Sequence, residues 1–196
     1  MNLLVGKIGF WSAILATIFL AISGITSSAS IYLVSNFSGF ILTSIFLIVI
    51  ICIYYSAPED KKIYGHIGLS FAIIYASMIS MNYFIQLTFV QFGAFDTDIL
   101  SITDPHSMMM TIEVFGYFFM GLSTLFIAPL YRSGRLEQSI RWLFVFNGIS
   151  GIVGAIGFAL NLDWGILIGG LMIWTMIMTV TIALLAYWFK IKYHVI

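Results

Sequence analysis

The sequence predicts an all-α protein, a polytopic transmembrane bundle of six helices with both termini in the cytoplasm. Three observations favour this fold class: 61% of the 196 residues are hydrophobic, only 8% are charged, and long apolar runs recur along the whole chain. Soluble domains are about 45–50% apolar and about 25% charged. A run of about 18 apolar residues is long enough to cross a hydrocarbon core of about 30 Å as a helix.

Six such runs divide the chain into one integral membrane domain, residues 1–196, without room for a soluble domain. We expect the helices at about residues 8–25, 37–55, 66–90, 108–130, 140–160 and 164–189. The second helix ends where Pro58 and four charged residues follow it. The longest connection runs from Gln91 to Ser107 and contains three aspartates.

The basic residues test this count and orient the bundle. With six crossings, all eight Lys and Arg fall on the side of the N-terminus, and the opposite side receives Asp96, Asp98, Asp104 and Asp163. The basic side is cytoplasmic by the positive-inside rule. We therefore expect a multi-pass protein of the cell membrane, plasma or inner, that is surrounded by the lipid bilayer. The eight basic residues are Lys7, Lys61, Lys62, Arg132, Arg135, Arg141, Lys190 and Lys192.

Several classes of partner and cofactor are not expected. The formal net charge is zero and no basic cluster is large enough to indicate nucleic-acid binding. The single cysteine, Cys52, lies in an apolar run, so it can form neither an intrachain disulfide nor a cysteine metal cluster. We expect Cys52 to be a core residue, and we expect no metal and no cofactor.

Polar side chains interrupt the third and fourth apolar runs. Asn82 and Gln86 are spaced i, i+4, so they lie on one face of the third helix. We expect Asp104 to cap the fourth helix, which would start near His106. Glu113 then lies about 12 Å along that helix at about 1.5 Å per residue, at a depth similar to that of Asn82.

Glu113 is the only acidic residue deep inside a predicted crossing. A charged side chain there costs roughly 2.5–3.5 kcal/mol, so this carboxyl must be neutral, hydrogen-bonded or in contact with water. His106, Glu113 and Tyr117 are spaced i, i+7 and i+11 near one stripe of the helix, with His106 at the water-facing end.

These polar residues also have structural interpretations. Asn82, Gln86 and Glu113 could only join neighbouring helices by hydrogen bonds. Asp104 with Pro105 could only start a helix, and His106 could be an exposed interface residue. If they form a site, the third and fourth helices are direct neighbours whose polar side chains face the bundle interior. The 91–107 connection would then fold over the outer mouth, because loops of more than about 12–15 residues are often functional lids.

Glycines recur on the fifth helix, at Gly148, Gly151, Gly154 and Gly157. Small residues at this spacing let helices approach closely. We expect close packing within the bundle, and a homo-oligomer through helix 140–160 is the alternative.

We expect an interfacial aromatic belt to account for nine aromatic residues near helix ends: Trp11, Tyr32, Tyr54, Tyr55, Tyr131, Trp142, Trp164, Tyr187 and Trp188.

Four short motifs carry a family resemblance: Asn82 to Gln86, Pro105-His106, Glu113 to Tyr117, and Gly134 to Glu137 followed by Arg141-Trp142. In these motifs the chain resembles a group of prokaryotic multi-pass membrane proteins with no assigned activity. The resemblance covers about the second and third quarters of the chain. It implies the fold and the membrane location only.

Three function classes remain. We favour an outer-leaflet cavity centred on Glu113, with Asn82, Gln86, His106 and Tyr117, that binds or transports a small lipophilic or amphipathic molecule. One alternative is an intramembrane enzyme in which Glu113 and His106 are an acid–base pair, and another is an accessory subunit without a ligand. One histidine with scattered carboxylates is a poor metal set, and no Ser-His-Asp or Cys-His order is recognisable, so no catalytic residue is assigned.

Overall fold

Helices account for the whole regular structure of the described residues, 3–90, 100 and 107–195, in which there is no strand. The structure is a computed structural model. Its six long helices are each long and apolar enough to span a membrane, as predicted. They are α1 (Leu3–Ser28), α2 (Tyr32–Ser56), α3 (Lys62–Ile85), α4 (Met108–Ile127), α5 (Gly134–Ala159) and α6 (Trp164–Tyr193). The short turns are η1 (Glu59–Lys61), the π-helical η2 (Gln86–Val90) and η4 (Ala128–Leu130).

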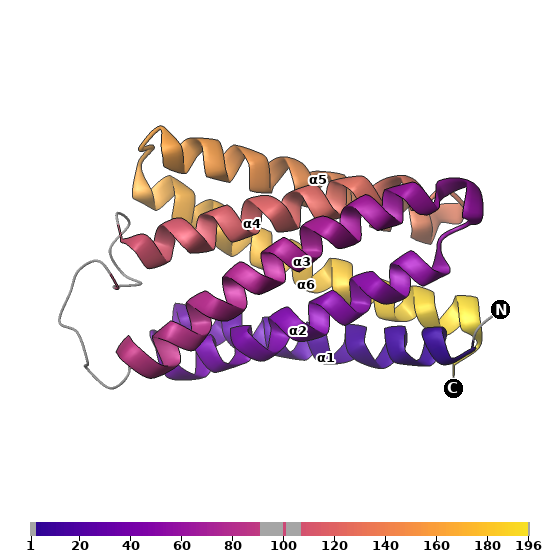
Figure 1. The fold of residues 1–196 in the computed structure, drawn as a ribbon, viewed down its shortest axis with the longest axis horizontal. Coiled ribbons are helices and arrows are strands. Elements are labelled where there is room, and N and C mark those ends of the chain that lie inside the picture. Colours follow the sequence, from indigo (N-terminus) through magenta and orange to yellow (C-terminus); the bar gives the residue numbers. More distant parts are fainter. Residues whose placement is uncertain (1–2, 91–99, 101–106, 196) are drawn as a thin grey trace.

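The six helices form a ring in chain order, since each one packs against its neighbours in the chain. Each helix is antiparallel to the one before it, and α1 closes the ring by packing against α6. Both termini therefore lie at one end of the bundle, which we call the terminal end (Figure 1). The α1–α2 and α5–α6 turns lie at the opposite end, the distal end. A ring of six helices has a central volume that side chains from all of them must fill.

The basic residues are gathered at one end of this axis. The eight basic residues occur near the start of α1, in or near the α2–α3 and α4–α5 connections, and in the last turns of α6, all toward the terminal end. At the distal end, Asp163 caps α6 by accepting a hydrogen bond from the Ile166 N–H at 3.2 Å. The clustering of basic residues behind the predicted orientation is thus present in the fold, whereas Asp96, Asp98 and Asp104 lie outside the described residues. The cytoplasmic location of the terminal end stays a prediction.

Four helices begin earlier than the apolar runs indicate, at Leu3, Tyr32, Lys62 and Gly134. The predicted ranges followed continuous apolar sequence, whereas a helix can continue beyond the hydrocarbon core with polar side chains. Ser28 illustrates this at the end of α1, where its hydroxyl donates to the Gly24 carbonyl at 2.9 Å. Helix length therefore exceeds apolar length at the ends of the bundle.

The start of α4 corrects one prediction. Ser107, not Asp104, is the N-cap: its backbone is extended, and its Oγ accepts from the Met110 N–H at 3.1 Å. The helix begins at Met108, the first residue of the predicted range 108–130 and two residues after the start near His106 that an Asp104 cap implied. A serine satisfies the orphan N–H groups of a first turn as well as an aspartate does. Asp104, Pro105 and His106 lie outside the described residues.

Glycines bring α4 and α5 into close contact, as predicted. A Cβ on Gly151 would lie 2.9 Å from the Tyr117 carbonyl oxygen, and one on Gly121 would lie 3.1 Å from the Gly148 carbonyl oxygen. Gly148 and Gly151 therefore pack against α4 inside the bundle. Gly154 has no neighbour within 4 Å of its Cβ position. A homo-oligomer through this helix stays a prediction.

The terminal half of the bundle is densely packed, and two aromatics there differ from the belt interpretation. Tyr131 and Trp188 are buried, with ring centroids 5.1 Å apart. The Trp188 indole donates to Glu137 at 2.9 Å, and the same carboxylate accepts from the backbone N–H of Ser133 at 2.7 Å. Tyr131 and Trp188 thus lie near helix ends but inside the bundle, where Trp188 bonds to Glu137. Trp142, in contrast, is exposed, as a belt residue should be.

Candidate functional site

The polar residues of α3 and α4 meet at one depth, as the helix arithmetic predicts. Glu113 Oε2 accepts from Asn82 Nδ2 at 3.4 Å, and Glu113 Oε1 accepts from the hydroxyls of Tyr83 at 3.2 Å and Tyr117 at 3.3 Å. The two hydroxyls are 3.4 Å apart. We call Asn82, Tyr83, Glu113 and Tyr117 the Glu113 cluster. The expectation that the third and fourth helices are neighbours with polar contacts is confirmed.

A glycine on α2 makes room for one member of the cluster. Gly39 faces Tyr83 so closely that a Cβ would lie 2.5 Å from a ring carbon. No real Cβ could occupy that position without moving the ring. Gly39 thus lets α2 approach α3 while the Tyr83 phenol reaches Glu113. On α4, Gly116 gives similar room to the side chain of Ile79 of α3.

Gln86 does not reach the carboxyl. Its Nε2 donates instead to the backbone carbonyl of Leu100 at 3.3 Å. Gln86 Oε1 and Asn82 Oδ1 are buried and have no hydrogen-bond partner among the described residues. The i, i+4 spacing places both amides on one face. Gln86, however, lies where α3 changes into the π-helical turn η2, and its side chain bonds to the segment that follows. His106 is outside the described residues.

A cavity of about 960 Å³ opens beside the cluster. All six helices line it, toward the distal end of the bundle, and Glu113 and Tyr117 form part of its wall. Toward the terminal end, Phe46 and Ile182 are the buried lining residues, and the fully buried Ile53 and Phe189 lie beyond them. The described part of the chain therefore has a cavity in one half and a packed core in the other.

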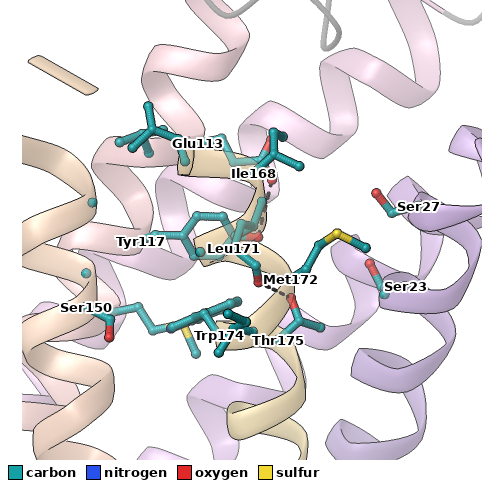
Figure 2. Close-up of a pocket in the computed structure, with 18 of the residues that line it drawn as sticks. Ser23, Ser27, Glu113, Tyr117, Ser150, Ile168, Leu171, Met172, Trp174 and Thr175 are labelled. Carbon is teal, nitrogen blue, oxygen red and sulfur yellow. Dashed lines mark hydrogen bonds between the residues drawn. The ribbon is translucent and has the colours of Figure 1, made fainter. Parts of the chain in front are cut away.

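The wall opposite Glu113 is also polar. Ser23 and Ser27 of α1 lie across the pocket from Glu113 and Tyr117 of α4 (Figure 2). The Ser23 hydroxyl lies 3.3 Å from that of Ser35 on α2, and the Asn36 side chain lines the cavity beside it. An occupant could thus make polar contacts on two sides.

The α5–α6 wall is apolar and thin. Val153 and Ile173 both line the cavity. Val153 exposes 60% of its surface and Ile173 exposes 58%, so few other side chains cover them. Gly165 and Gly170 line the same wall and contribute no side chain. Lipid would lie directly outside these residues, so this wall separates the cavity from the bilayer by little more than one helix.

Trp174 connects the cluster to a second polar group. Its ring packs edge-on against that of Tyr117, with centroids 4.9 Å apart, and its indole donates to Asn147 Oδ1. Asn147 Nδ2 in turn donates to Thr124 Oγ1 at 2.6 Å. Hydrogen bonds thus join α4, α5 and α6 behind the cavity wall and fix the orientation of the Trp174 ring.

The sequence interpretation did not identify Tyr83 or Trp174. Tyr83 is adjacent to Asn82, and its phenol reaches the same carboxyl from a position one residue farther around the helix. Trp174 carried a signal, since it lies in the middle of an apolar run, where the interfacial role typical of tryptophan does not apply. An indole away from water usually has a hydrogen-bond partner, and that of the half-buried Trp174 is Asn147.

The described residues contain no group of three or more His, Cys, Asp or Glu side chains placed to hold a metal ion. The chemistry at the cavity wall is that of one carboxyl group, several phenols, one indole, and the hydroxyls and amide of the opposite wall. Such a set can accept and donate hydrogen bonds and can surround a cation. The acid–base pair proposed for an enzyme needs His106, whose position is not described.

Comparisons with known proteins identify no relative: no protein-family model, no curated protein and no solved structure matches the chain.

Proposed function

We propose that the protein is an integral membrane protein that binds a small lipophilic or amphipathic molecule in the cavity beside Glu113. One observation carries this proposal: a cavity of about 960 Å³ is mostly apolar but has a carboxyl group and two phenols at its wall. Ligand pockets are typically about 300–1,000 Å³, with a few polar groups in an apolar lining. Helix packing alone does not require such a volume, because protein interiors are normally close-packed.

The position of the cavity favours binding from the membrane or the outer surface. If the basic terminal end is cytoplasmic, the cavity lies in the outer leaflet of the cell membrane. The glycine-containing α5–α6 wall places it next to lipid, from which an amphipathic molecule could enter sideways. Binding is the function that the geometry supports best. Transport would also require a path through the packed terminal half.

Filling the cavity tests the proposal. Gly154 lines the cavity and has open space at its Cβ position, on the same stripe of α5 as Asn147 and the cavity-lining Phe158. Gly154→Phe should therefore occupy cavity volume. Gly169→Phe is the matched control, because Gly169 also has open space but does not line the cavity. Both changes replace a helical glycine by the same side chain.

The measurement is thermal stabilisation of the purified protein in nanodiscs by a panel of hydrophobic and amphipathic probes. We expect one or more probes to stabilise the wild type and the Gly169→Phe variant in a saturable manner but not the Gly154→Phe variant. A panel that stabilises all three proteins equally would contradict binding in this cavity.

A further inference from the structure

We infer that the occupant of the cavity is an organic cation, such as a hydrophobic amine or a quaternary ammonium compound, whose charge lies against Glu113. This inference rests on the proposed function and adds the chemical class of the ligand. It depends on three features of the described residues: the charges that line the cavity, the donors around Glu113, and the aromatic rings beside it.

Glu113 has no counter-charge among the described residues that line the cavity. Among the described lining residues, Glu113 is the only acidic one, and no Lys, Arg or His lines the cavity. All eight basic residues of the chain lie toward the terminal end, away from it. A carboxylate at membrane depth is usually paired with another group. A cationic ligand would supply the positive charge that the described lining residues do not.

The hydrogen bonds around Glu113 hold it as an acceptor. Asn82, Tyr83 and Tyr117 each place a donor against a carboxyl oxygen. An ionised carboxylate only accepts hydrogen bonds and has about four lone-pair positions, so three donors leave room for a further contact from the cavity side. The cluster therefore orients the carboxyl group without neutralising it.

Aromatic rings surround the space next to this carboxyl. Tyr117 packs against Trp174 with centroids 4.9 Å apart and lies 6.3 Å from Tyr75, which in turn lies 5.5 Å from Phe46. All four rings line the cavity, as does that of Tyr83. Aromatic faces attract cations within about 6 Å, and desolvated sites do so most strongly. A carboxyl group among aromatic rings is the combination that recognises an organic ammonium group.

The test uses three probes that differ in charge: tetraphenylphosphonium (cation), tetraphenylborate (anion of the same shape) and triphenylphosphine oxide (neutral). Binding to the full chain in nanodiscs is measured by equilibrium dialysis, and partition into empty nanodiscs is subtracted. We expect saturable binding of the cation and no saturable binding of the anion.

Variants then locate the charge. Glu113→Gln, which keeps an acceptor for the neighbouring donors, should weaken cation binding by at least about tenfold. Trp174→Leu should weaken it by about threefold or more through the loss of one aromatic face. Glu59→Gln is the charge control, because Glu59 is exposed at the terminal end and pairs with Lys62. It should leave cation binding unchanged.

The outcomes separate this inference from the proposed function. Saturable binding of the neutral probe that Gly154→Phe abolishes, without preference for the cation, would overturn the cation inference and leave the proposed function intact. Equal cation affinity in the wild type and in folded Glu113→Gln would overturn it too. If Glu113→Gln does not fold, undiminished cation binding by Trp174→Leu is the overturning result. Absence of saturable binding by all three probes also overturns the inference, and the probe panel with Gly154→Phe then decides the proposed function separately.

Discussion

Asn82 on α3 lies directly opposite Glu113 on α4, with the amide nitrogen 3.4 Å from a carboxyl oxygen. The two residues are separated by 31 positions in the chain, most of them in the connection between the helices. Their meeting fixes the relative depth and rotation of α3 and α4, which places the carboxyl at the wall of the cavity. The stability of this contact can be measured apart from any ligand.

Replacing Glu113 should reveal how much the cluster stabilises the fold. Glu113→Ala removes the acceptor of three donors, and we expect a loss of about 1–3 kcal/mol because buried donors without partners are costly. Glu113→Gln keeps an acceptor oxygen and should lose less, about 0.6 kcal/mol, the average for hydrogen bonds between membrane helices. Reversible unfolding in detergent measures both. Equal stability of Glu113→Ala and the wild type would contradict the cluster geometry.

At the terminal end, substitutions of Tyr131 and Trp188 should have opposite effects on stability. The Tyr131 hydroxyl is buried without a hydrogen-bond partner among the described residues, and burial, with the nearby Glu137, raises the pKa of this phenol well above its ordinary value. The neutral Tyr131→Phe variant should therefore be as stable as the wild type or more stable by about 1 kcal/mol. Trp188→Phe loses the bond to Glu137 and should be less stable by about 1 kcal/mol. A larger loss from Tyr131→Phe than from Trp188→Phe would contradict this description.

The orientation in the membrane can be tested by cysteine labelling. Asn161→Cys lies in the α5–α6 turn at the distal end and Ser133→Cys at the terminal end, both exposed, while the native Cys52 is buried. In intact cells a membrane-impermeant maleimide should label only Asn161→Cys. Ser133→Cys should react after permeabilisation. The reverse pattern would place the terminal end outside and refute the positive-inside argument.

If the ligand is a cation, its affinity should depend on pH through Glu113. Protonation removes the negative charge, so tetraphenylphosphonium should bind more tightly as the pH rises, and Glu113→Gln should show no such change. The other titratable groups that line the cavity are the phenols of Tyr32, Tyr75, Tyr83 and Tyr117. α1, α5 and α6 contribute none among the described lining residues. Identical pH profiles for both proteins would exclude Glu113 as the titrating group.

The sequence predicted the parts of this structure that follow from helix geometry. Apolar runs predicted six helices, and a rise of about 1.5 Å per residue predicted that Asn82 and Glu113 share a depth. The rotation of α6 was not predictable, because an apolar helix of this kind carries no polar face that marks its inner side. Trp174 could therefore be assigned to the cavity only after α6 was packed between α5 and α1.

Single polar residues in the sequence were also ambiguous, because their partners depend on how the helices pack. Asp104 and Ser107 are both good N-caps, and only the backbone at Ser107 shows which one starts α4. Gln86 and Asn82 share a helical face, yet only Asn82 reaches Glu113, because α3 ends at Ile85 and Gln86 is its C-cap residue. Local sequence thus indicated which residues are polar at depth, and tertiary packing decided which of them meet.

Photo-crosslinking from adjacent positions of α4 tests the binding cavity most directly. Val114 lines the cavity, whereas Phe115 does not and exposes 49% of its surface. A diazirine amino acid is placed at each position, the cells are irradiated, and the adducts on the purified protein are identified by mass spectrometry. The account predicts a recurrent small-molecule adduct at position 114 that is absent at 115, where bulk lipid adducts should dominate. The same mixture of bulk lipids at both positions would contradict it.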